Sequence, residues 1–391
     1  MTDELLIEIL LWLPVPCLYD FRRVSKKWRE IISSSYFKEL LRKRNKKLEE
    51  RDLSSLLGFY VTECESKHAF LPTSSLIHRT TSDKRKGNAL VPRGCSFIAC
   101  SNGMLLFGNH RSQAYYLCNF TRQERIHLPK PSYTRSNVAM GFHFDDVNSE
   151  FVIVRAELSD FPNYSCTVNM ETIISTRSTV RWGRSVPLTF AHFKFQIRPF
   201  ECAVHVNGVF YWLELNNRLL AYEYDHDRCF CIPLPESDGY VVELSAMLGE
   251  SKDGILQYGR SNCFDFRVWV LEDCASIAGI MSPRWVMRHN VSFMLLHHWY
   301  PDLLSSCHLI LHQGRYWYQR YAHVPLLVAF HKPEFVFLRL GNGILLVYYL
   351  FQQKLELVSL QGNMEIMGYG PSQRNWRKLV PLFGPTWFYL P

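Results

Sequence analysis

The 391-residue chain has no hydrophobic run long enough to form a transmembrane helix. Its Leu-rich opening, from Glu4 to Leu13, is too short to span a bilayer and contains Glu8. Asp3 and Glu4 also stand where a secretory signal peptide would carry positive charge. We therefore expect no association with a membrane, and we expect the chain to work in the nucleus or the cytoplasm.

The sequence also lacks the cysteine spacing of a disulfide framework. Its twelve cysteines are scattered along the chain, and no C-x-x-C pair occurs. We interpret these cysteines as reduced and mostly buried.

The usual anchors of catalytic sites are missing as well. No G-x-x-x-x-G-K-[ST], G-x-G-x-x-G, G-x-S-x-G or H-E-x-x-H motif occurs, so nucleotide-binding, serine hydrolase and zincin functions lack their usual evidence. His226, Cys229 and Cys231 could offer three soft metal ligands, but no second ligand pair follows at zinc spacing. We interpret the two cysteines as core residues of a strand, and we predict no metal site and no cofactor.

A few polar and aromatic groups remain as candidates for chemistry. Asp145-Asp146, and Asp225 with Asp227, lie between expected strands, where aspartate usually stabilises turns. We therefore predict no catalytic residue. The run from His297 to Tyr300 could line a recognition surface. Three tryptophans are interpreted as core residues between β-sheets: Trp212, Trp269 and Trp285.

The net charge of +8 is too evenly spread to indicate nucleic-acid binding by itself. Residues 1–51 carry 12 Lys/Arg against 8 Asp/Glu, and six of the ten residues from Arg42 to Arg51 are basic. We interpret this basic run as a solvated linker helix, with a nuclear-localisation or phosphate-binding patch as the alternative.

Residues 3–41 have the pattern of three short helices. In the first, from Glu4 to Leu13, apolar residues recur at helical spacing, and Pro14 ends it. Pro16 suits the first turn of a second helix, and Ser25 is a suitable N-cap for a third. We expect this stretch to be too small to bury its own apolar residues and therefore to dock onto another surface.

This stretch resembles the F-box, the module that joins substrate receptors to Skp–cullin–F-box ubiquitin ligases. The matching residues are Asp3-Glu4-Leu5-Leu6, Ile9-Leu10, Leu13-Pro14, Leu18, Phe21-Arg22, Val24-Ser25, Trp28 and Ile31-Ile32. The resemblance implies that a Skp-type adaptor, and through it a cullin scaffold, binds these helices. The implied adaptor-binding residues are Leu5, Leu6, Ile9, Leu10, Leu13, Pro14, Leu18, Phe21, Val24, Trp28 and Ile32.

One position departs from the family pattern. F-boxes usually carry Leu-Pro just before the acidic pair, and Met1-Thr2 stands there in this chain. Either the adaptor contact is weaker than in other members, or the natural chain begins further upstream.

After Leu57 the helical period gives way to short strands rich in Val, Ile, Phe, Tyr and Trp. A turn followed by an apolar strand recurs at Asn102-Gly103, Asn207-Gly208, Asp253-Gly254 and Gly341-Asn342-Gly343. The intervals are 46, 105 and 135 residues, of which 46 and 135 are close to one and three times about 45, the length of a propeller blade. We therefore expect an all-β domain that forms a degenerate six- or seven-bladed β-propeller.

This part resembles the associated interaction domain of plant F-box proteins. The matching fragments are Gly141-Phe142-His143-Phe144-Asp145, Asn207 to Leu213, Pro233-Leu234-Pro235 and Val268 to Glu272. Beyond about residue 290 the chain is more similar to kelch-like receptors.

Together these patterns divide the chain into three parts. We expect an F-box-like helical module at 1–41, a basic linker helix at 42–57 and a propeller-like domain at 58–391. The resemblance implies a non-catalytic subunit that recruits an as yet unidentified target protein for ubiquitination. The alternatives are a propeller enzyme acting on a glycan or small molecule, a free-standing binding protein, and a basic nucleic-acid-associated adaptor.

Overall fold

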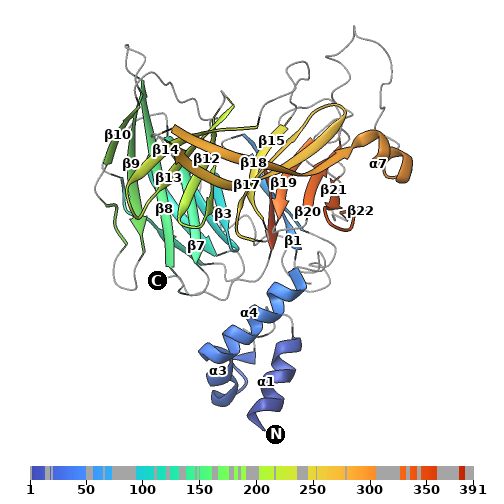
Figure 1. Ribbon diagram of the computed structural model, residues 1–391. Coiled ribbons are helices and arrows are strands. Elements are labelled where there is room, and N and C mark those ends of the chain that lie inside the picture. Colours follow the sequence, from blue (N-terminus) through green and yellow to red (C-terminus); the bar gives the residue numbers. More distant parts are fainter. Residues whose placement is uncertain are drawn as a thin grey trace.

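The structure is a computed structural model, and it contains a helical module followed by a β-domain (Figure 1). The residues that it describes are 2–13, 18, 21–49, 56–64, 67–72, 94–109, 112–119, 124–131, 138–145, 148, 150–160, 166–175, 180–183, 186–190, 202–214, 217–235, 245–251, 253–277, 280–304, 326–331, 335–340, 345–358 and 378–383. Within these residues, no helix has both the length and the apolar character needed to cross a membrane.

The helical module consists of α1 (Asp3–Trp12), α3 (Lys26–Ser33) and α4 (Ser35–Glu49). The Thr2 hydroxyl caps α1 by accepting a hydrogen bond from the Leu5 amide. The Ser25 hydroxyl caps α3 in the same way, accepting from the Trp28 amide at 3.1 Å, which confirms the predicted N-cap. The second expected helix, after Pro16, lies largely outside the described residues.

The helices of this module share an apolar core. Its fully buried side chains are Leu6, Leu10, Leu18, Ile32, Phe37 and Leu41. The expectation that the stretch is too small to bury its own apolar residues was wrong in this respect. The pattern predicted three helices in this stretch, whereas a further helix, α4, begins within it at Ser35 and supplies Phe37 and Leu41 to the core. The basic run from Arg42 therefore begins inside α4, and the first strand begins at Leu56.

The strands of the β-domain form units of four antiparallel strands, called blades here. Blade 1 contains β3 (Ser96–Ser101), β4 (Met104–Asn109), β5 (Ala114–Asn119) and β6 (Glu124–His127). Blade 2 contains β7 (Val138–Asp145), β8 (Glu150–Asp160), β9 (Cys166–Ile174) and β10 (Val186–Phe190). Blade 3 contains β11 (Cys202–Val206), β12 (Val209–Glu214), β13 (Arg218–Glu223) and β14 (Arg228–Pro233).

Two further blades follow in the chain, and a sixth sheet contains the first and the last described strands of the β-domain. Blade 4 contains β15 (Ser245–Glu250), β16 (Leu256–Ser261), β17 (Asp265–Ile277) and β18 (Ile280–Ser292), and the helix α7 (Phe293–Trp299) follows it. Blade 5 contains β19 (Leu326–His331), β20 (Phe335–Arg339), β21 (Leu345–Tyr349) and β22 (Lys354–Leu357). Blade 6 is the three-stranded sheet of β2 (Lys67–Pro72), β1 (Leu56–Cys64) and β23 (Lys378–Phe383).

The blades follow one another around a ring, as in a β-propeller. The first strand of each blade lies beside the first strand of the next, in the order β3, β7, β11, β15 and β19, and β19 lies beside β23. The strands β7 and β11 even pair in parallel, which joins blades 2 and 3 into one eight-stranded sheet. The first and last described strands of the domain, β1 and β23, pair with each other and so join the two ends of the domain in one blade. The described strands thus make six blades.

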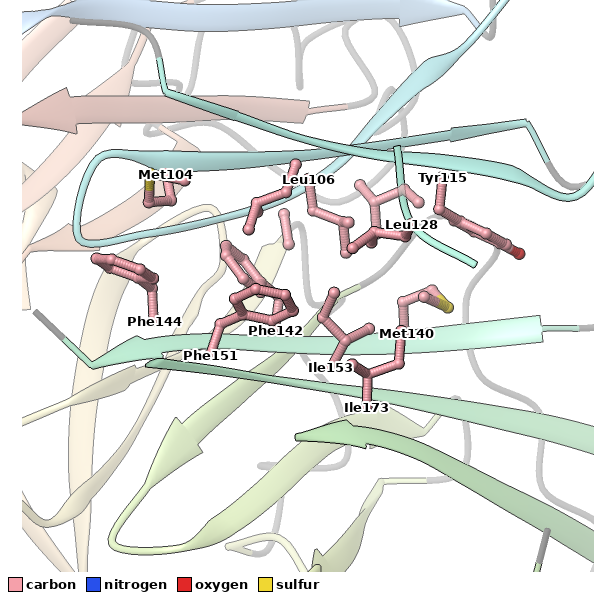
Figure 2. Close-up of a cluster of buried hydrophobic side chains, with 13 residues drawn as sticks. Met104, Leu106, Tyr115, Leu128, Met140, Phe142, Phe144, Phe151, Ile153 and Ile173 are labelled. Atoms are coloured by element: carbon pink, nitrogen blue, oxygen red, sulfur yellow. The ribbon is translucent and has the colours of Figure 1, made fainter. Parts of the chain in front are cut away.

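Blades 1 to 5 bury the faces that they turn toward one another. Figure 2 shows this between blades 1 and 2, where Leu106 and Leu128 face Phe142, Phe151 and Ile153. Trp212 is fully buried between blades 2 and 3, and its indole N–H donates to the Met140 carbonyl at 3.0 Å. Trp269 is buried between blades 3 and 4, where Trp285 is partly buried. The prediction of core residues is confirmed for Trp212 and Trp269, and Trp285 packs against the same core while staying partly exposed.

The repeated turns also connect neighbouring blades. Asn102-Gly103 and Asn207-Gly208 all have positive φ, as expected of the turn residues of tight hairpins. The Asn102 amide donates to the Phe144 carbonyl of blade 2 at 2.7 Å. The Asn207 amide donates to the Gly254 carbonyl of blade 4 at 2.8 Å. Each asparagine therefore shapes its own turn and holds the next blade. The turn at residues 341–343 lies outside the described residues.

Candidate adaptor-docking surface

Helix α1 has two apolar faces with different surroundings. Leu6 and Leu10 are buried in the core of the helical module. Leu5, Ile9 and Trp12 are exposed by 54%, 45% and 85%, respectively. Positions i, i+4 and i+7 share one face of a helix, so these three side chains form a continuous stripe. We call Leu5, Ile9 and Trp12 the α1 stripe.

Capping and charge fix the orientation of α1. Thr2 caps its first turn, and Asp3 and Glu4 lie where the helix dipole favours negative charge. The Asp3 carboxylate forms an ion pair with the Lys27 ammonium of α3. This pair is exposed and contributes little to stability, so α1 is held mainly by Leu6 and Leu10 in the shared core.

The predicted adaptor-binding residues separate into three groups. Leu6, Leu10, Leu18 and Ile32 are buried in the module, so in the free chain they hold the helices together and offer no surface to a partner. Leu5, Ile9 and Val24 are exposed. Leu13, Phe21 and Trp28 are half-buried, and the Phe21 and Trp28 rings pack edge to face with centroids 5.3 Å apart. Pro14 lies outside the described residues.

Two exposed aromatic residues of the module were missed by sequence reasoning. Trp12 is the most exposed large hydrophobic residue of the described chain, and Tyr36 at the start of α4 is also exposed. The sequence did contain a signal for Trp12, because it continues the spacing of Leu5 and Ile9 along the same face. Tyr36 had no comparable signal.

The exposed charges of the module differ between helices. Glu4 and Glu8 are exposed on α1, whereas α3 exposes the three bases Lys26, Lys27 and Arg29 and one acid, Glu30. A partner that covers the α1 stripe and extends over α3 would therefore meet an apolar centre with acidic and basic edges. Such a layout resembles the apolar core and polar rim of protein–protein interfaces.

The candidates for metal binding are arranged for other purposes. In the described part of the chain, no group of three or more His, Cys, Asp or Glu residues could hold a metal ion. His226 is exposed and pairs with the Glu223 carboxylate at 2.9 Å. Cys229 and Cys231 pack against the core between blades 2 and 3. Burial raises the pKa of both thiols above the ordinary value, which disfavours the thiolate that would bind a metal.

The candidate carboxylates serve turns, as the sequence indicated. Asp145 accepts hydrogen bonds from the backbone and side-chain amides of Asn148. Asp227 has positive φ and accepts a 2.6 Å hydrogen bond from the Tyr222 hydroxyl. Asp225 is exposed in the same turn between β13 and β14, and Asp146 lies outside the described residues.

Comparison with known proteins agrees with the two-part architecture. A family model described as "F-box domain" matches residues 1–40. A second model, described as "F-box protein At3g26010-like, beta-propeller", matches residues 56–306. Fold and matches together define an F-box protein with a β-propeller. The chain belongs to the At3g26010-like F-box protein family, named for an Arabidopsis thaliana protein to which it is 25% identical over 70% of this chain and 66% of that protein.

Two further Arabidopsis thaliana proteins are similar over most of their length. F-box protein At5g03970 is 26% identical, and the alignment covers 99% of this chain and 88% of that protein. F-box protein At5g07610 is 22% identical over 85% of this chain and 78% of that protein. Among solved structures, the β-propeller domain of Myceliophteria thermophila Cps50 (Swd1) matches with 8% identity and a TM-score of 0.33, covering 68% of this chain and 89% of that one, which is too low to inform the fold. The kelch-like character predicted beyond residue 290 stays a prediction.

Proposed function

We propose that this chain is the target-recruiting subunit of a Skp–cullin–F-box ubiquitin ligase. The helical module binds a Skp-type adaptor, the adaptor joins a cullin scaffold, and the propeller holds the target protein. Membership of an F-box family supports an adaptor-bound role for the chain. Such a subunit raises the effective concentration of a target lysine near the charged conjugating enzyme, and it needs no catalytic residue for this.

The observation that carries the proposal is the α1 stripe. A helix whose second apolar face is left exposed by the described part of its chain is typical of a surface that a partner covers. Covering the remaining exposed surface of Leu5 and Ile9 would contribute roughly half of the 1.5–3 kcal/mol of a fully exposed side chain for each, and exposed tryptophan is a frequent anchor of interfaces. The buried face of α1 meanwhile keeps the module folded without the partner.

Co-purification of the full chain with a Skp-type adaptor tests the proposal. The informative variant is Ile9→Asp/Trp12→Asp, because both side chains are exposed and neither belongs to the module's buried core. Glu30→Ala on α3 is the control, since Glu30 is exposed and lies outside the stripe.

We expect wild type and Glu30→Ala to bind the adaptor in a one-to-one complex and the double variant to lose it. Circular dichroism should show unchanged helix content in all three proteins. If the folded double variant still binds as wild type does, the α1 stripe is not the docking surface. If wild type itself stays monomeric beside the adaptor, the ligase role is wrong for this chain.

A further inference from the structure

A second exposed apolar surface lies on the β-domain, around helix α7. The described part of this domain exposes few large hydrophobic side chains, and most of them gather here. Phe264, Met294, Leu295, Trp299 and Phe351 are all about half exposed or more. We call these five residues the α7 surface.

Helix α7 holds three of these residues on its outer side. Its inner side buries Phe293 and Leu296 in the core between blades 4 and 5. Met294, Leu295 and Trp299 therefore point away from that core, and Leu295 and Trp299 are one helical turn apart. A peripheral helix of a globular domain normally exposes polar residues on its outer side, so this apolar outer side calls for an explanation.

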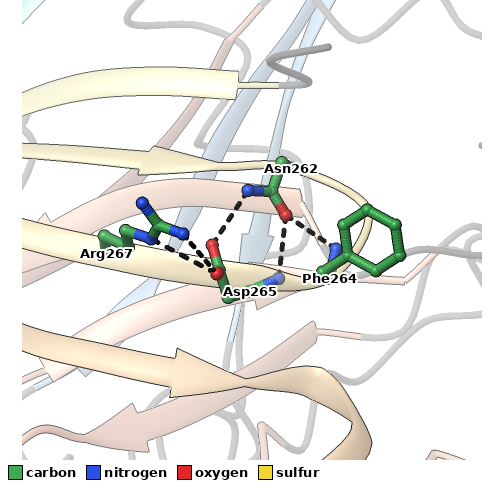
Figure 3. A network of polar contacts seen from close by, with 4 residues as sticks. All are labelled: Asn262, Phe264, Asp265 and Arg267. Carbon is green, nitrogen blue, oxygen red and sulfur yellow. Dashed lines mark hydrogen bonds and ion pairs between the residues drawn. The ribbon is translucent and has the colours of Figure 1, made fainter. Parts of the chain in front are cut away.

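The neighbouring turn places Phe264 beside the start of α7. The Phe293 amide donates to the Phe264 carbonyl at 2.9 Å. As Figure 3 shows, the turn is held by Asn262, whose side-chain oxygen accepts from the Phe264 and Asp265 amides at 2.7 and 2.9 Å. Arg267 donates two hydrogen bonds to the Asp265 carboxylate, and the Phe264 ring points away from these polar contacts. The turn therefore presents Phe264 in a fixed position at little entropic cost to a partner.

The turn between β21 and β22 places Phe351 at the other end of α7. The Phe351 ring meets the His289 ring of β18 edge to face, with centroids 5.6 Å apart. The Tyr300 hydroxyl, at the C-terminal end of α7, donates to the Gln353 carbonyl at 3.5 Å. Apolar side chains from three separate segments thus surround one short helix.

The charges around the α7 surface indicate what kind of partner fits it. The Asp265 carboxylate pairs with Arg267, Glu272 pairs with both Arg288 and Arg284, and Glu356 pairs with Lys354. Asp302 is exposed just after α7, so four acids stand against four bases. Because these acids and bases neutralise one another, the rim has no excess of one sign to select a charged peptide. Affinity must come from apolar contact, and the two-turn ridge of α7 suits a second helix packed across it.

We infer that the α7 surface docks the apolar face of an amphipathic helix of the target protein. The inference rests on the proposed target-receptor function and assigns the target contact within it. Trp299 and Phe264 are the expected anchors, because large aromatic side chains on preorganised elements dominate binding energy. Methionine at position 294 allows related helices to be accepted, since its side chain adapts to different shapes.

Selection from a phage-displayed library of helix-forming 16-residue peptides on the full chain tests this inference. We expect the selected peptides to carry Leu, Phe or Met at i, i+3 and i+4, and their affinity to change less than about threefold between 50 and 500 mM salt. Met294→Ala/Trp299→Ala should weaken their binding at least about tenfold. Leu295→Ala should weaken binding, while the matched control Ile174→Ala, on blade 2 and equally exposed at 47% against 46%, should not.

The inference is overturned by peptides that bind the Met294→Ala/Trp299→Ala variant as well as wild type, by a selection of charged peptides released by salt, or by no enrichment at all. Adaptor binding is measured on the same preparations. The α7 variants should keep it, because the α1 stripe is intact. If the wild-type chain selects peptides but does not bind the adaptor, the ligase role is wrong and the inference about the α7 surface is still supported. Failure of the proposed function and failure of this inference are therefore distinguishable.

Discussion

At the scale of single residues, asparagine has two structural roles in the turns of the propeller: it adopts the turn conformation and it bonds the next blade. Asn207 has φ of 47°, a conformation that asparagine adopts more readily than most residues. Its side chain also bonds the Gly254 carbonyl of the next blade. The same pair of roles falls to Asn102 between blades 1 and 2. Hairpin geometry and blade packing are thus coupled through one side chain.

Substitution of Asn207 separates these two roles. Asn207→Gly keeps the positive φ and loses only the hydrogen bond, so it should lower the free energy of unfolding by about 1 kcal/mol. Asn207→Ala loses the bond and also strains the backbone, and should cost about 1–2 kcal/mol more. Urea unfolding of the full chain measures both. Equal effects of the two variants would show that backbone conformation at Asn207 does not matter.

A second residue with a large expected effect is Arg155, buried between blades 1 and 2. Its guanidinium lies 2.9 Å from the Glu171 carboxylate and 3.7 Å from that of Glu157, and all three side chains are almost fully buried. Arg155→Met would leave two buried carboxylates without their arginine and should destabilise the chain by about 3–5 kcal/mol.

The control for Arg155→Met is the triple variant Arg155→Met/Glu157→Gln/Glu171→Gln, which removes all three charges together. It should recover most of the lost stability in the same unfolding measurement, because no charge then remains buried. A single variant as stable as wild type would show that the ion pair is not needed.

The pH dependence of stability has a contribution from His289. Burial, with a smaller effect of Arg288, lowers the pKa of this imidazole below its ordinary value. The unfolded chain therefore takes up a proton first as the pH falls, so this contribution is present above about pH 6.5 and declines below it. We expect His289→Gln to lose less stability than wild type between pH 7.5 and 5.5. Parallel unfolding curves for the two proteins at both pH values would contradict this.

At the scale of elements, the predictions of turns and helix caps were correct because these features depend on residues close together in the sequence. The Asn-Gly dipeptides correctly predicted turns, because positive φ is a property of those residues themselves. Ser25 was a correct N-cap because its hydroxyl acts on an amide three residues away. In each case the decisive interaction lies within a few residues.

Other elements depend on contacts between distant segments, which no local pattern contains. The division of α1 into a buried and an exposed face depends on Phe37 and Leu41 of α4, so sequence reasoning placed buried and exposed leucines in one adaptor-binding set. The pairing of β1 with β23 joins residues more than 300 positions apart. The parallel contact of β7 and β11 also has no signal in either strand alone.

Closure of the ring by β1 and β23 should dominate the stability of blade 6. Val380 pairs with Tyr60 in the middle of this contact. Val380→Pro removes a backbone donor there and should cost at least about 2 kcal/mol, with faster proteolysis of the chain. Val380→Thr keeps the donor and the β-branched shape and serves as the control. Equal proteolysis rates for both variants would show that the pairing does not hold the ring closed.

At the scale of the whole molecule, two exposed apolar surfaces belong to two different parts of the chain. The α1 stripe lies on the helical module, and the α7 surface lies at the junction of blades 4 and 5 (Figure 1). The aspartates that the sequence offered as candidates for acid–base chemistry serve turns away from both surfaces. The proposed recruitment of a target to an adaptor requires two separate surfaces of this kind.

The affinity of a Skp-type adaptor for single alanine variants of the α1 stripe tests the central claim most directly. Isothermal titration of Leu5→Ala, Ile9→Ala and Trp12→Ala should show weaker binding in each case, with Trp12→Ala reduced at least about tenfold. Glu30→Ala should bind as wild type does. If all three stripe variants bind with wild-type affinity, the helical module does not use this face to join a ligase.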